Sequence, residues 1–332
     1  MIKRTSHVKS NSPIGEEFSV YLDLLRVVAA YYVMLFHMKK LQLGPETWLM
    51  FVPDHGHDAV ILFFVLSGYV IAAATEKKQA LGFREYLLDR ASRVYSVALP
   101  ALLLSAFLAL SFQSLLKVEK PYSLDELAVS TVANLLFLGQ SWNWKIWVFY
   151  NQPYWSLCYE VMYYVGFGVF IFARGWTRWL GLFVVALIAG PKVVLLLPCW
   201  VLGVLAYKYR DLLPLKTGTG LAIGFVLPAL ILIALSKLGF GPAVRTMALE
   251  LWGDQKASLE FSKDFLIDYV TASLVAVNLY AARYIRFPFL LFFKRAIVVA
   301  ASFSFTLYLM HLPMIFLLVN SLGGSVGSAY SF

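Results

Sequence analysis

The stretch YLDLLRVVAAYYVMLFHMKK, residues 21–40, decides the fold class of this chain. It is long enough to cross a bilayer as a helix, since a spanning helix needs roughly 20 predominantly apolar residues. It nevertheless contains Asp23, Arg26 and His37. An ionisable side chain inside a membrane is costly, so it usually faces the interior of a helix bundle and marks a functional site. The stretch therefore predicts a membrane protein with a polar interior.

The composition of the whole chain agrees with this prediction. Of its 332 residues, 60% are hydrophobic and 14% are charged, and the mean hydropathy is +0.72. Soluble domains have about a quarter charged residues, so a soluble fold is excluded. The net charge of +9 comes from short basic clusters between apolar runs, the positive-inside pattern of membrane proteins rather than a nucleic-acid-binding surface. Cys158 and Cys199 lie in apolar stretches without ligand spacing, so neither a disulfide framework nor a zinc site is expected.

Apolar runs of spanning length recur along the chain. They lie near residues 20–38, 58–75, 94–113, 154–173, 178–191, 193–208, 219–238, 264–284 and 296–320, with a weaker run near 126–140. We therefore expect an all-α, polytopic membrane bundle of about ten transmembrane helices. The expected organisation is a cytoplasmic tail over residues 1–18, a membrane domain over 19–321 and a short tail over 322–332, with no separate soluble domain.

The basic clusters predict the orientation of the chain in the membrane. If residues 126–140 are re-entrant, the chain crosses about nine times and its C-terminus is outside. If they cross, there are about ten crossings and the C-terminus is inside. The clusters around Arg4 and Arg90 are cytoplasmic under either count, because the ambiguity lies downstream of them. We expect an integral protein of the inner, cytoplasmic membrane whose N-terminus is cytoplasmic.

Arg26 and His37 project from one face of the first span, because eleven residues make about three helical turns. They are separated by roughly 16 Å along the helix axis, which suits the two ends of one interior groove. The alternative is that Asp23 pairs with Arg26 near one membrane surface while His37 lies at the other. Imidazole is the side chain best suited to proton transfer near neutral pH, which favours a functional His37.

The stretch VPDHGHDAVILFFVLSGYV, residues 52–70, places two histidines and a carboxylate before the second span. His55, His57 and Asp58 do not have the spacing of a recognised zinc site. We therefore interpret them as solvated loop residues and expect no metal. Gly68, inside the span, is expected to permit close packing of two helices.

Arg90 and Arg93 stand at i and i+3 where the chain enters the membrane again, so they share one face of a helix at the cytoplasmic boundary. Two guanidinium groups in that position can hold a phosphate. Anchoring of the helix by the positive-inside rule is the alternative interpretation, and the spacing alone favours neither.

In NQPYWSLCYEVMYY, residues 151–164, Asn151 is predicted to cap a helix that places Ser156, Glu160 and Tyr164 on one face. A carboxylate in that aromatic setting must pair across helices, stay protonated or act on a substrate. An ion pair with an arginine of another span is the main alternative to a functional role for Glu160.

The last span contains SFSFTLYLMHLP, residues 302–313, in which His311 follows several hydroxyl side chains. We expect these groups to form hydrogen bonds across helices rather than to catalyse a reaction.

Taken in order, these segments resemble the integral-membrane acyltransferase 3 family. The resemblance rests on Asp23 to Arg26 followed by His37 after ten intervening residues, Asp58 to Gly68, the Arg90-x-x-Arg93 pair, Trp155-Ser-Leu-x-x-Glu160, and Ser304 to His311-Leu-Pro313. Asp89 stands where many members of the family carry a basic residue.

The resemblance implies transfer of an acyl group, commonly acetyl and sometimes succinyl, from a cytoplasmic acyl-CoA to a hydroxyl of a cell-envelope or exported polysaccharide or glycolipid. Acyl-CoA is then a co-substrate and no tightly bound cofactor is expected; the partners are the glycan acceptor and membrane lipid, with no nucleic acid. It also implies catalytic roles for His37, Arg26 and Glu160, and binding of coenzyme A by Arg90 and Arg93. Supporting roles are expected for Asp23, Asp58, Ser67, Trp155, Ser156, Tyr164 and His311.

Two other functions are compatible with the same residues. Arginine, histidine and glutamate inside a membrane also serve proton relays, so the chain could be a transporter or flippase for a glycan or lipid. It could also be a structural subunit of an envelope-biosynthesis complex in which the polar residues only pair. The sequence leaves the acyl chain and the acceptor sugar open.

Overall fold

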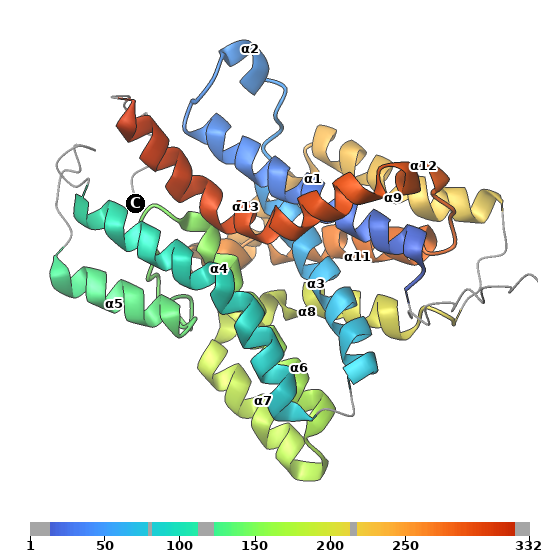
Figure 1. The fold of residues 1–332 in the computed structure, drawn as a ribbon, viewed down its shortest axis with the longest axis horizontal. Coiled ribbons are helices and arrows are strands. Elements are labelled where there is room, and N and C mark those ends of the chain that lie inside the picture. Colours follow the sequence, from blue (N-terminus) through green and yellow to red (C-terminus); the bar gives the residue numbers. More distant parts are fainter. Residues whose placement is uncertain (1–13, 79–81, 112–122, 213–217, 323–332) are drawn as a thin grey trace, which may run out of the picture.

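The computed structural model describes residues 14–78, 82–111, 123–212 and 218–322 (Figure 1). All regular structure in this part of the chain is helical. The long helices are α1 (Glu16–Lys40), α3 (Gly56–Lys78), α4 (Phe83–Ser111), α6 (Trp155–Phe172), α7 (Gly175–Ala189), α8 (Pro191–Lys208), α9 (Thr219–Lys237), α10 (Phe240–Trp252), α11 (Phe265–Ala282) and α13 (Lys294–Ser321). Shorter elements are α2 (Glu46–Leu49), α5 (Leu124–Leu135), α12 (Pro288–Phe292) and the 3₁₀ segments Gln152–Tyr154 and Gly253–Ser262.

The described part of the chain contains seven helices that are long and apolar enough to cross a membrane, or eight when the bent pair α9 and α10 is counted as one span. Every apolar run expected from the sequence contains a helix. The all-α, multi-pass architecture is therefore confirmed, with a span count close to the expected one. The difference arises in part because α7, with 15 residues, is shorter than the roughly 20 needed to span a bilayer.

The weak run near residues 126–140 contains the short helix α5. Its 12 residues extend for only about 18 Å, whereas the hydrocarbon core of a bilayer is about 30 Å thick. A capping box between Ser123 and Glu126 sets its start, and the chain turns at Phe137, which has a φ of 57°. Helix α5 lies alongside α4 (Figure 1), so this segment resembles the re-entrant alternative more than a full crossing.

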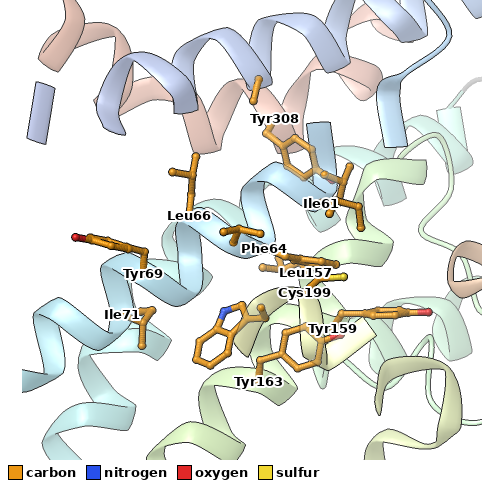
Figure 2. Close-up of a cluster of buried hydrophobic side chains, with 14 of the residues drawn as sticks. Ile61, Phe64, Leu66, Tyr69, Ile71, Leu157, Tyr159, Tyr163, Cys199 and Tyr308 are labelled. Atoms are coloured by element: carbon orange, nitrogen blue, oxygen red, sulfur yellow. The ribbon is translucent and has the colours of Figure 1, made fainter. Parts of the chain in front are cut away.

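The centre of the bundle is an aromatic core between α3, α6 and α8. Figure 2 shows Phe64 of α3 among side chains that include Tyr159 and Tyr163 of α6. Trp200 of α8 packs against the ring of Tyr163, with the two ring centroids 6.0 Å apart. Helices α1 and α13 lie side by side across this core (Figure 1). The core holds α1, α3 and α6 at fixed positions, and these helices carry most of the predicted site residues.

Contacts between α1 and α3 define the two ends of the bundle. The Gly56 backbone at the start of α3 packs on the ring of Phe36, next to His37, while Phe18 near the start of α1 packs on Tyr69 further along α3. The two helices are therefore antiparallel. We call the end that contains His37 and the start of α3 the His37 end, and the end that contains Arg90 and the last turns of α3 the Arg90 end.

Helices α3 and α8 approach each other through two glycines. A Cβ atom added to Gly68 would overlap the carbonyl oxygen of Trp200, and one added to Gly203 would overlap the carbonyl oxygen of Val65. Only glycine leaves room for backbone atoms at both positions. The prediction that Gly68 permits close helix packing is confirmed.

The variant Gly68→Ala is expected to be less stable than the wild-type protein, because the added methyl group must push α3 and α8 apart. Overpacking of a core typically costs 1–3 kcal/mol. The measurement is the midpoint of thermal unfolding in detergent. The control is Gly166→Ala in α6, where the nearest atom lies 3.7 Å from the added Cβ. Equal midpoints for the two variants would contradict the close approach of α3 and α8.

Candidate functional site

An open cavity lies between α1, α3, α4, α6 and α13. Its empty volume is about 900 Å³, which includes the open space at its mouth. The charged side chains in its wall are Arg26, Arg90, Arg93 and Glu160, which come from three different helices. Their arrangement in one wall was predicted only in part, because the sequence does not show how α1, α4 and α6 pack. The hydroxyl groups in the wall belong to Ser67, Ser156, Tyr164, Ser304 and Tyr308.

The three arginines give this cavity an excess of positive charge. Arg26 pairs with Asp23 at 3.6 Å, as the spacing predicted, and Arg90 pairs with its neighbour Asp89. Arg93 has no ion pair among the described residues. The side chains of Asp23 and Asp89 are not in the cavity wall. The cavity wall therefore presents three guanidinium groups to an anionic ligand for one carboxylate, that of Glu160.

Glu160 is held by a chain of hydroxyl groups. The Tyr164 hydroxyl donates to Glu160 Oε1 at 2.5 Å and lies 3.0 Å from Ser67 Oγ, which in turn accepts from the Trp200 indole nitrogen at 3.2 Å. Because the Tyr164 proton is donated to Glu160, the Tyr164 oxygen accepts from Ser67, and the Ser67 proton therefore points to Tyr164. The donors of the chain are directed toward the carboxylate and hold it in place.

The alternative of an ion pair between Glu160 and an arginine of another span is not observed, since no basic nitrogen of the described residues lies within the ion-pair distance of its carboxylate. The physical reason is that hydroxyl donors occupy Glu160 instead. The prediction that Ser156, Glu160 and Tyr164 share one face of a helix is confirmed, because all three line the cavity from α6. The carboxylate is therefore held in place without being neutralised.

His37 lies outside this cavity wall and forms a pair with His311 of α13. His37 Nδ1 is 2.9 Å from the Val33 carbonyl oxygen and 3.2 Å from His311 Nε2. His311 Nδ1 is 2.9 Å from the Tyr308 carbonyl oxygen. A carbonyl oxygen only accepts, so Nδ1 carries the proton in both rings. In its neutral state, His37 therefore has Nε2 as its basic nitrogen. The expected hydrogen bonding of His311 across helices is confirmed.

Tyr308 connects the histidine pair with the cavity. Its hydroxyl group lies 2.7 Å from Ser156 Oγ in the cavity wall, and its backbone carbonyl accepts from His311. The sequence analysis noted the hydroxyl groups of this span but did not select Tyr308. The sequence could have indicated Tyr308 by its spacing. It lies three residues before His311 and four after Ser304, which places all three near one face of the helix.

The other predicted supporting residues lie away from the cavity. Asp58 accepts a hydrogen bond from His55 at 2.7 Å. Trp155 stacks between His57, at 5.8 Å between ring centroids, and Phe261, at 4.0 Å. His55 and Asp58 are 41% and 37% exposed, as expected for solvated residues, and they face each other in a polar pocket at the start of α3. No group of three or more metal-ligating side chains is arranged to hold an ion in the described residues.

Asn151 does not cap the helix as predicted. The chain first forms the 3₁₀ turn Gln152–Tyr154, and the Asn151 side chain makes no capping hydrogen bond. It donates instead to the Leu309 carbonyl oxygen of α13 at 3.0 Å. The Asn151 side chain therefore forms a contact with another helix, α13, instead of capping the helix that follows it in the sequence.

The fold and the cavity define a multi-pass membrane protein with a charged interior site. The chain matches the family described as an acyltransferase domain over residues 19–327, so it belongs to the acyltransferase 3 family. An O-acetyl transferase of Shigella phage Sf6 is 34% identical over 86 residues, which are 26% of this chain and 25% of the phage protein. The chain thus aligns with about a quarter of that relative's length. No solved structure matches the chain.

Replacing Tyr164 by Phe is expected to lower the thermal unfolding midpoint. The change removes the donor to Glu160 and leaves a carboxylate oxygen inside the bundle with one partner fewer; a hydrogen bond to a charged group contributes about 1.5–3 kcal/mol. Tyr31→Phe is the matched control, because Tyr31 is half exposed and its hydroxyl group has no hydrogen bond in the described structure. A midpoint for Tyr164→Phe equal to that of the control would show that the chain of hydroxyl groups does not hold Glu160.

Proposed function

We propose that the protein is an acyl-CoA-dependent O-acyltransferase of the inner membrane, which transfers an acetyl or succinyl group to a hydroxyl of an envelope or exported glycan. The observation that carries the proposal is the convergence of Arg26, Arg90 and Arg93 with Glu160 in one interior cavity. Membership of the acyltransferase 3 family and the name of the phage relative support the class of reaction. The positive-inside pattern supports a cytoplasmic Arg90 end and a cytoplasmic N-terminus.

The Arg90 end of the cavity binds the donor in this proposal. Coenzyme A carries phosphates, and planar guanidinium groups bind phosphate oxygens in pairs. Arg93 is the strongest candidate for binding a phosphate, because it has no ion pair among the described residues. Arg90 pairs with Asp89 and must break that ion pair before it binds the ligand. The pantetheine arm then extends inward along the apolar side chains that form most of the cavity wall, among them Val60 and Phe63.

His37 removes the proton from the acceptor hydroxyl through Nε2. The acceptor oxygen forms a bond with the thioester carbonyl carbon, the carbon–sulfur bond breaks, and the thiolate leaves and takes up a proton as coenzyme A. His311 supports His37 by accepting from its Nδ1–H, which orients the ring. The reaction then takes place between the cavity and the histidine pair, near Tyr308, because that residue contacts both.

Arg26 stabilises the negative charge that develops on the thioester oxygen in the transition state. Its guanidinium lines the cavity, and a fixed cation in a site that excludes water is more effective than one in solution. Its pairing with Asp23 at 3.6 Å holds the side chain in place without covering it, since Asp23 is not in the wall. Glu160 lies opposite as a fixed acceptor for the donor's amide or hydroxyl groups.

The double variant Arg90→Ala with Arg93→Ala is expected to bind coenzyme A at least tenfold more weakly, because two charge-assisted hydrogen-bond donors to phosphate are lost, each contributing about 1.5–3 kcal/mol. Isothermal titration calorimetry in detergent measures the dissociation constant. Arg178→Ala is the control, since Arg178 belongs to α7 and is outside the cavity wall. An unchanged affinity of the double variant would refute the donor site.

His37→Ala is expected to lower the rate of acyl transfer by about a hundredfold to ten-thousandfold, the usual effect of losing a general base. The assay follows label from radiolabelled acetyl-CoA into glycan, with protein in liposomes. Binding of coenzyme A by the variant should stay at the wild-type level, because His37 lies outside the cavity wall. A variant that inserts normally and transfers label at the wild-type rate contradicts this role. Glycan flux without label transfer by the wild-type protein would identify a transporter instead.

A further inference from the structure

A second polar pocket lies at the His37 end of the bundle, where α3 and α11 begin and α9 meets α10. From Asp58 in its wall to Thr75 at the Arg90 end, α3 extends for roughly 25 Å. The pocket is therefore far from the arginines of the donor site. It is close to the reaction centre, because His57 in its wall precedes Val60 in the cavity wall by less than one turn, and because Gly56 packs beside His37 on Phe36.

Each basic side chain around this pocket lies next to a carboxylate. Arg245 places Nε and a terminal nitrogen 3.0 Å from Asp264 Oδ2, and His57 Nε2 lies 3.1 Å from Asp268 Oδ1. Two further pairs complete the set: His55 with Asp58 at 2.7 Å, and Lys39 with Asp54 at 3.1 Å. A histidine is charged only when it is protonated, and the wall holds the four carboxylates of Asp54, Asp58, Asp264 and Asp268 against one arginine. The pocket therefore does not favour an anion such as coenzyme A.

The wall of the pocket contains groups that can form hydrogen bonds with a ligand. Asp268 is 1% exposed, and its Oδ2 lies in the protein interior without a hydrogen-bond partner in the described residues. A buried carboxylate oxygen without a donor costs about 1–3 kcal/mol or more, so a ligand that supplies an O–H group there is favoured. Thr271, one turn further along α11, adds a hydroxyl group to the same wall. The ring of Phe240 adds an apolar surface to the wall.

We infer that this pocket binds the acceptor, a neutral sugar unit whose hydroxyl groups donate to Asp268 and whose C–H face packs on Phe240. A sugar is the class of ligand that combines several O–H donors, no net charge and an apolar face. The inference rests on the proposed function for the identity of the reaction. The inference goes beyond the proposed function because it assigns the acceptor site to His57, Asp268 and Thr271. These residues belong neither to the donor cavity nor to the histidine pair.

The arrangement also explains how the acceptor meets the acyl group. His57 stacks on Trp155, and Trp155 is followed in α6 by Ser156, whose hydroxyl group contacts Tyr308 in the cavity wall. A sugar held against His57 and Asp268 therefore lies near Trp155, whose neighbour Ser156 is in the cavity wall. His37 is at the same end of the bundle, because the adjacent Phe36 packs on Gly56 next to His57.

The test uses the full-length protein in detergent with acetyl-CoA and, as acceptor probe, deacylated oligosaccharides released from the source organism's own surface polysaccharide. Asp268→Asn keeps the side-chain size but weakens the acceptor oxygen, and is expected to raise the KM for oligosaccharide at least tenfold. Thr271→Val should raise it about threefold. In both variants the affinity for coenzyme A stays at the wild-type value. Asp211→Asn, an exposed carboxylate paired with Arg283 at the Arg90 end, is the control and leaves both constants unchanged.

Thr271→Val decides the matter if Asp268→Asn does not fold, because the loss of one hydroxyl leaves the His57 pair intact. Wild-type KM values in every folded variant overturn the acceptor site. If the wild-type protein transfers no acyl group at all, the proposed function fails, and equilibrium dialysis with the same oligosaccharides then tests the pocket alone. Binding by the wild-type protein that is lost in the variants supports the pocket, whereas equal or absent binding overturns it.

Discussion

Every polar group inside a bilayer must find its partner within the protein, and this constraint organises the whole bundle. Asp23 and Arg26 satisfy it within one helix, and His37 and His311 satisfy it between the first and last helices. Glu160 satisfies it through a chain of donors and not through an opposite charge. The cost of burying these groups thus requires α1, α3, α6 and α13 to meet, which is the arrangement that creates the cavity.

Close packing of α3 against α8 determines how the polar groups around Glu160 are arranged. Gly68 and Gly203 bring α3 and α8 within backbone contact, which places Ser67 next to the indole nitrogen of Trp200. Without that approach, Ser67 would lack its hydrogen-bond donor. The small residues at the interface between α3 and α8 therefore help to place the polar residues of the cavity wall.

The sequence was sufficient for the fold class, for the close approach at Gly68 and for the face shared by Ser156, Glu160 and Tyr164, because each depends on local composition or helical spacing. Features that depend on which helices are neighbours could not be predicted. The pair of His37 with His311 joins residues at opposite ends of the chain. Asn151 was assigned to the helix start because its contact with Leu309 of α13 is invisible in the local pattern.

The two polar sites of the bundle differ in charge in the way that a transfer between unlike substrates requires. The cavity at the Arg90 end has three guanidinium groups for one carboxylate, which favours a ligand carrying phosphates. The pocket at the His37 end has four carboxylates for one arginine, and a buried oxygen of Asp268 has no hydrogen-bond donor among the described residues, which disfavours phosphates and favours a ligand that donates hydrogen bonds. In the proposed reaction, this difference in charge would place the two substrates at opposite ends of the bundle, so that only the acyl group would have to pass between them.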